Sequence, residues 1–222
     1  MDPISAATHF APYDFYYARL RARGGLTYDS ALGLWVASSA AAVAAVLNHP
    51  ACRVRPPQEP VPRAIAGRPA GDVFARLMRM NDGLRHGCPR AAMAAPLQQL
   101  GAIDLQPWLA QWRPALSAPQ GANDLQRWQW RLPVALLAGL LGIAAERRED
   151  LARRTGEFVA CLSPLSNAEQ LQAADSAAQH LIQQMQALLD APQHSPFLRA
   201  ILERSQGLAP EDLQANLLGL LA

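Results

Sequence analysis

The sequence contains no lysine, so its 20 basic residues other than histidine are all arginines. The 18 acidic residues leave a formal net charge of +2, and the arginines are dispersed along the chain. A nucleic-acid-binding protein is expected to carry a basic stripe or cluster on one face. We therefore expect no nucleic acid partner.

Cysteine is also scarce. The three cysteines, Cys52, Cys88 and Cys161, lie far apart and form no Cys-x-x-Cys pair. Their number and spacing predict neither a disulfide framework nor a structural metal site. The first residues lack the basic and then apolar pattern of a signal peptide, so we expect a cytoplasmic protein.

Long apolar runs are missing as well. The longest covers only residues 132–145, which is shorter than the roughly 20 residues that a helix needs to cross a bilayer. This run suits a buried core helix, and we expect no membrane association. Half of the 222 residues are hydrophobic, which is enough to bury a core.

Several catalytic motifs are absent. The chain has no Gly-x-Ser-x-Gly elbow, no His-Glu-x-x-His zinc motif and no dinucleotide or P-loop fingerprint. The corresponding hydrolase, zinc protease and nucleotide-binding classes therefore have little support.

The first part of the chain, residues 12–50, has the pattern of a helix, a β-hairpin and a second helix. Two short β-prone runs are separated by a Gly-containing loop. Residues 51–79 are rich in proline and arginine, and this density predicts an irregular connection. Together with the helical residues 80–222, these parts are expected to form one domain.

The last predicted helix begins at Pro210 and becomes apolar on every side. Such a helix should be buried, yet its pattern runs to the last residue without a stop signal. We therefore expect that the domain is incomplete and that the chain ends inside a longer helix.

A basic pair stands at a suggestive spacing in residues 82–90. His86 and Arg90 are four residues apart, so on one helix their side chains can converge on a single anion. Asp82 could cap that helix. Two other interpretations remain open: these are ordinary surface charges, or Pro89 begins the helix and the pair does not share a face.

These patterns together resemble the amino-terminal half of bacterial cytochrome P-450 monooxygenases. The resemblance rests on the motif Asp-x-x-x-His-x-x-x-Arg at residues 82–90 and on the amino-acid sequences of residues 32–38 and 43–50. It also rests on Leu-Pro-Val followed by Leu-Leu-Gly-Ile within residues 132–143. It implies a mainly α fold with a small β-hairpin near the N-terminus. It also implies haem, hydroxylation or epoxidation of a small organic substrate with O2, and electrons from a ferredoxin or a flavin reductase.

The resemblance assigns roles to a few residues. His86 and Arg90 would bind the haem propionates. Val73, Phe74 and Leu77 would line the substrate pocket, with plain core packing as the alternative. The oxygen-activating acid and threonine, the Glu-x-x-Arg pair and the cysteine loop of the family are absent from the sequence, so we assign no catalytic residue and expect the chain alone to be inactive.

Two further hypotheses remain. One is a haem-free helical module that binds a partner or self-associates through an exposed apolar terminus at Leu217 to Leu221. The other is haem binding without a thiolate, with His86 as an axial ligand of the iron.

Overall fold

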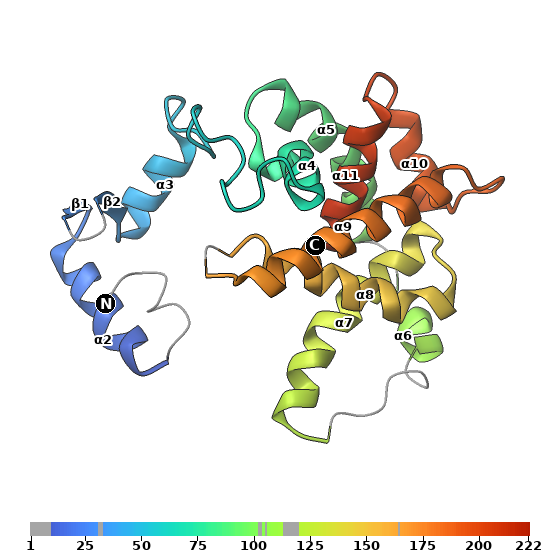
Figure 1. The fold of residues 1–222 in the computed structure, drawn as a ribbon, viewed down its shortest axis with the longest axis horizontal. Helices are drawn as coiled ribbons and strands as arrows, with labels where there is room; N and C mark the ends of the chain where they lie inside the picture. The colour runs from blue at the N-terminus through green and yellow to red at the C-terminus, as the bar shows by residue number, and fades with distance from the viewer. Residues whose placement is uncertain (1–9, 31–32, 102–103, 105, 113–119, 164) are drawn as a thin grey trace. The chain divides into compact units, whose positions relative to one another are not determined.

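The computed structural model describes residues 10–30, 33–101, 104, 106–112, 120–163 and 165–222. The chain forms two compact units, residues 1–53 and residues 54–222, and each is described by itself (Figure 1). The single incomplete domain that the sequence suggests stays a prediction.

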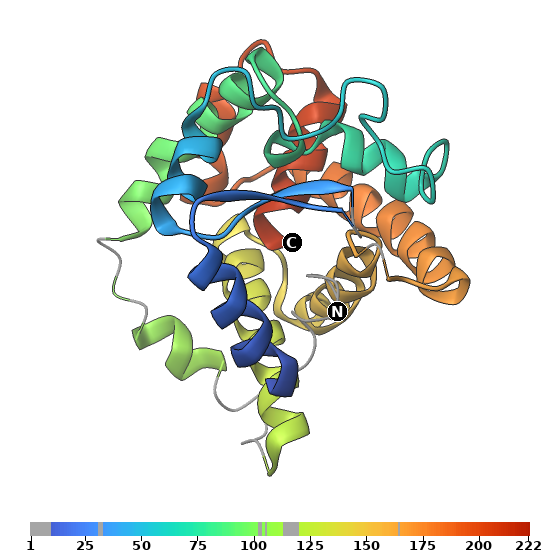
Figure 2. The ribbon, with the colours of Figure 1, turned by 90° about the vertical axis from the view of Figure 1, so that its left-hand side faces the viewer.

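The first unit contains the predicted helix, hairpin and helix. Helix α2 (Phe10–Arg23) is followed by the antiparallel strands β1 (Leu26–Asp29) and β2 (Leu34–Ala37), and then by α3 (Ala40–Asn48). Figure 2 shows the two strands side by side in blue. The hairpin near the N-terminus is therefore confirmed.

The second unit is helical throughout its regular structure, within the residues described. Its elements in chain order are α4 (Pro69–Arg76), the 3-10 turn η1 (Met78–Met80), α5 (Leu84–Leu100), α6 (Gln106–Trp112), α7 (Ala122–Leu141), α8 (Ala145–Ala160), α9 (Ala168–Leu189), α10 (Pro196–Arg204) and α11 (Pro210–Leu221). No helix in these ranges is long and apolar enough to cross a bilayer.

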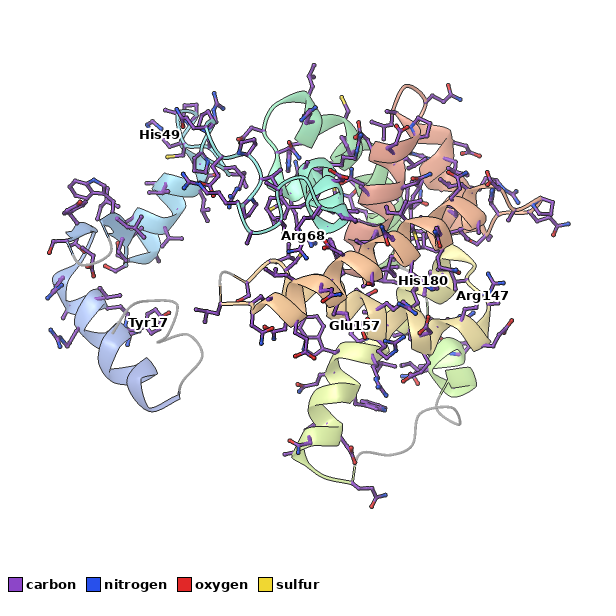
Figure 3. The ribbon with its side chains drawn as sticks, in the orientation of Figure 1. Tyr17, His49, Arg68, Arg147, Glu157 and His180 are labelled. Carbon is purple, nitrogen blue, oxygen red and sulfur yellow. The ribbon has the colours of Figure 1, made fainter. Side chains whose placement is uncertain are left out.

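Helix α4 corrects the prediction that residues 51–79 are irregular. The prediction holds for the described residues up to 68, but Pro69 stands at the first helical position, where its missing N–H costs nothing. Asp175 of α9 stabilises this end of the helix. Its carboxylate accepts from Arg68 Nε at 2.7 Å and from Ala70 N at 3.1 Å. Arg68 is labelled in Figure 3.

Helix α5 runs through Pro89, so the interpretation in which the helix begins at that proline is wrong. Its backbone starts after Gly83, whose φ of 62° lies in the left-handed region that favours glycine. The Gly83 carbonyl accepts from His86 N and Gly87 N at 3.2 and 2.8 Å. His86 and Arg90 therefore lie one turn apart on a continuous helix.

The core of the second unit lies where α4, α7, α8, α9, α10 and α11 pack together. Burial of the last helix is confirmed, because Leu217 and Leu218 are 0 % exposed and Leu221 is 4 % exposed. Figure 1 shows α11 in red beside α4 and α9. The exposed terminus expected at Leu217 to Leu221 is corrected here, since the chain's own helices cover Leu217, Leu218 and Leu221 while Leu220 is half-buried; self-association itself stays a prediction.

Candidate functional site

The turn between α4 and α5 is held by a side chain of α11. Asn216 is 1 % exposed. Its Oδ1 accepts from Met78 N at 2.7 Å, and its Nδ2 donates to the carbonyls of Arg76 at 3.0 Å and Asp212 at 2.7 Å. These bonds fix η1. Because η1 leads into α5, they also fix the position of the backbone at His86.

His86 is oriented by the same turn. Its Nδ1 lies 3.0 Å from the Met78 carbonyl oxygen. A carbonyl only accepts, so Nδ1 carries the proton and donates it. In a neutral ring the other nitrogen, Nε2, then presents a lone pair, whereas in an imidazolium it presents a second N–H. The ring is half-buried, and its orientation is set by the protein.

Arg90 lies one turn further along α5 with an exposed side chain. Among the residues that the structure describes, it has no hydrogen-bond or ion-pair partner, so its guanidinium is available to an anion. The helix places Arg90 and His86 four residues apart, which is the spacing of one helical face. Their role as haem propionate ligands stays a prediction.

The three predicted pocket residues lie in the core. Val73, Phe74 and Leu77 are 5 %, 3 % and 1 % exposed. Leu77 packs so closely on α11 that a Cβ added at Gly219 would lie 3.0 Å from Leu77 Cδ2. The Arg55 guanidinium stands 5.5 Å from the centre of the Phe74 ring. Their burial fits the core interpretation of the sequence, and a pocket role for them stays a prediction.

Val73 also borders a hollow at the surface. This hollow, of about 540 Å³, lies between α4, α9 and α11. It is lined by Asp72, Val73, Ala75, Arg76, Arg85, Ile182, Glu211, Gln214 and Ala215. Arg76 pairs with Asp212 across α4 and α11 at 2.8 Å. Neither His86 nor Arg90 lines this hollow.

Arg79 of η1 was not singled out from the sequence. Its Nη1 donates to the Gly219 carbonyl at 3.2 Å, while its Nη2 is shut off from solvent and has no hydrogen-bond partner in the described part of the chain. Burial lowers the pKa of this guanidinium. Because its contact lies 140 positions along the chain, no local pattern could have marked this residue.

The cysteines offer no preformed metal site. Cys52 and Cys88 are exposed, and Cys161 is buried at the end of α8. Burial, together with the negative charge of Asp175, raises the pKa of the Cys161 thiol to about 11. Cys161 is therefore a neutral thiol at physiological pH. In the described part of the chain, no three His, Cys, Asp or Glu side chains are grouped to hold a metal ion.

Comparison with known proteins identifies the fold. No protein-family model and no curated protein matches the chain. Among solved structures, P450BioI, in complex with an acyl carrier protein ligated with hexadec-9Z-enoic acid, matches with a TM-score of 0.71 and 18 % identity, over 95 % of this chain and 56 % of that chain. CalO2 matches with a TM-score of 0.74 and 18 % identity, over 100 % of this chain and 57 % of that chain. The chain thus spans a little over half the length of these proteins, and its mainly helical fold is P450-like.

Proposed function

We propose that this chain forms the amino-terminal part of a cytochrome P-450 monooxygenase that hydroxylates or epoxidises a small organic substrate. The observation that supports this most strongly is the pair His86 and Arg90, one turn apart at the start of α5 within a P450-like fold. Their task would be to hold the carboxylate edge of the haem.

The donor set fits a haem carboxylate. A propionate is an anion, and charge-assisted hydrogen bonds from a histidine and an arginine are the strong way to hold it. Arg90 is exposed, and the bond of His86 to Met78 leaves Nε2 for a ligand. To donate from Nε2 as well, His86 must be an imidazolium, which the neighbouring anion favours.

Haem, when bound, supplies the oxygen activation, which in this family depends on a cysteine thiolate that pushes electrons towards the iron. The neutral Cys161 thiol does not suit this role, and neither Cys52 nor Cys88 stands in a cysteine loop of the family's kind. We therefore infer that the thiolate comes from outside these residues. The chain by itself would bind haem without performing the reaction.

The partners follow from the proposed chemistry. Electrons would come from a ferredoxin or a flavin reductase. The substrate would be a small organic molecule, free or attached to a carrier, since the P450BioI structure contains an acyl carrier protein. A haem-free binding module is the weaker proposal, because its exposed apolar terminus is not found: Leu217 and Leu218 are buried.

Haem titration of the purified chain, followed by its Soret absorbance, tests the proposal. We expect saturable binding that weakens about 10-fold or more in His86→Ala and in Arg90→Gln, because each removes a charge-assisted bond. Arg147→Gln, an exposed arginine on α8, is the matched control and should bind haem as the wild type does. Absence of saturable binding, or equal affinity in all variants, would overturn the proposal.

The titration also separates the two roles of His86. His86→Ala should abolish the spectrum of bound haem if His86 is an axial ligand of the iron, whereas in the propionate role it should only weaken binding. A red-shifted Soret band of thiolate type, after reduction under carbon monoxide, would contradict the absence of a thiolate ligand in this chain.

A further inference from the structure

Arg79 is a half-buried cation that has no counter-ion among the residues that the structure describes. It lies on η1, between α4 and α5, and it points to the last turns of α11, where Nη1 donates to the Gly219 carbonyl. Its Nη2 is buried and donates to nothing in the described chain. A buried donor without an acceptor loses its hydration without compensation.

Two other half-buried arginines of this unit are paired with carboxylates, whereas the guanidinium of Arg55, whose Nε is also buried without a partner among the described residues, lies over the Phe74 ring. Arg68 binds Asp175 with Nε and Nη2, at 2.7 and 2.6 Å from the same carboxylate oxygen. Arg154 binds Asp150 at 3.0 Å. Arg79 has no carboxylate within ion-pair distance among the described residues, so the protein itself does not supply the anion that its burial calls for.

We propose that Arg79 binds a carboxylate of a ligand that lies between η1 and α11. This inference rests on the proposed function, because that function supplies two sources of such a group: the haem propionates, or an organic acid as substrate. Met78 and Met80, which flank Arg79 on η1, are only partly buried apolar side chains, so the ligand would join a carboxylate to an apolar body.

The position suits a ligand contact rather than a purely structural one. Part of the Arg79 side chain stays accessible, but Nη2 itself is shut off from solvent, so a ligand reaches Nη2 through a shift of this side chain and not through an open cavity. The bond to Gly219 occupies one donor and leaves the others, and a guanidinium binds a carboxylate through two parallel N–H groups. The segment on which Arg79 stands is fixed by Asn216, so the guanidinium is preorganised for its ligand.

The test compares Arg79→Met and Arg79→Lys with Arg85→Met, a change of an exposed arginine on α5 that has no ion-pair partner in the described residues. The probes are haem, haem dimethyl ester, hexadec-9-enoic acid and its methyl ester. The first pair tests the propionates as the source of the carboxylate, and the second pair tests an acidic substrate. Binding constants and ligand-induced thermal shifts are measured for each protein.

We expect Arg79→Met to weaken binding of one of the two carboxylate probes by about 10- to 100-fold, as loss of a charge-assisted bond predicts. The corresponding ester should bind the wild type and the variant equally. Arg79→Lys should keep part of the affinity, and Arg85→Met all of it. Without ligand, Arg79→Met should melt close to the wild type, because loss of the bond to the Gly219 carbonyl is offset by removal of an unpaired buried donor.

Two results would overturn the inference. In one, Arg79→Met binds all four probes as the wild type does, which assigns Arg79 to the structure alone. In the other, the wild type binds neither carboxylate probe. If haem binding depends on His86 and Arg90 while neither carboxylate probe depends on Arg79, the proposed function stands and this inference falls. If only hexadec-9-enoic acid binds, and does so through Arg79, the inference stands and the haem proposal falls.

Discussion

Replacement of Asn216 by leucine tests the link between α11 and the start of α5. The change keeps the number and branching of the side-chain heavy atoms but leaves Met78 N without its acceptor and the Arg76 carbonyl without its donor. Each buried backbone group without a partner costs about 1–3 kcal/mol, and the added apolar contact returns about 1–2 kcal/mol. From the middle of these ranges, the free energy of unfolding should fall by about 2–3 kcal/mol, which corresponds to a melting temperature lower by about 4–12 °C in a chain of this size.

Thermal and urea unfolding, followed by circular dichroism, measure this loss. The matched control is Asn48→Leu, because Asn48 is exposed and bonds only within α3, to the Ala44 carbonyl at 2.8 Å. Its effect should stay within about 0.5 kcal/mol. If the leucine variants at 216 and 48 unfold alike, the three hydrogen bonds of Asn216 do not hold η1, and the reasoning is refuted.

Two further predictions concern the second unit. Asp175→Asn should keep the bond from Ala70 N but lose the charge that faces Arg68, lowering the free energy of unfolding by about 1–3 kcal/mol; urea unfolding checks this, and a neutral effect would contradict the ion pair. Because the pKa of Cys161 is raised from 9.0 to about 11, the unfolded chain ionises first, so stability should be full below about pH 9 and decline towards pH 11. Cys161→Ala should flatten this decline, and an unchanged slope would refute the assignment.

Local patterns were enough to predict much of the fold. The helix, hairpin and helix of residues 12–50 follow from apolar periodicity and from stop signals such as Gly24 and Gly25, which adopt φ values of 68° and 60°. The apolar surface of the last helix predicted its burial, since such a surface needs cover on every side. In these cases the signal and the structure lie in the same few residues.

Proline density was a poor guide to structure at α4 and α5, because tertiary packing determines both helices. The helix at α4 was missed because the proline density before it dominated the pattern, although Val73 and Phe74 form an apolar face that the core covers. In α5 the sequence left open whether Pro89 begins the helix. Pro89 is itself buried, so packing around it holds a helix that its missing N–H weakens.

In the candidate site, too, local sequence patterns mark some residues, while others are defined by contacts that are distant in sequence. His86 and Arg90 could be found because their spacing is local. Asn216 and Arg79 could not, since Asn216 contacts Met78 across 138 positions and Arg79 contacts Gly219 across 140. An asparagine among leucines is a weak sign of a buried polar contact, and it does not name the partner.

The last turns of α11 join the stability of the core to the proposed ligand site. Gly219 lets Leu77 pack against the helix and offers its carbonyl to Arg79, while Asn216 holds the residue whose carbonyl orients His86. If Arg79 and His86 hold a ligand as proposed, that ligand binds only while α11 is docked, and it stabilises the docked state by mass action. It follows that a change which loosens α11 from η1 lowers stability and ligand affinity together, even though it touches no ligand.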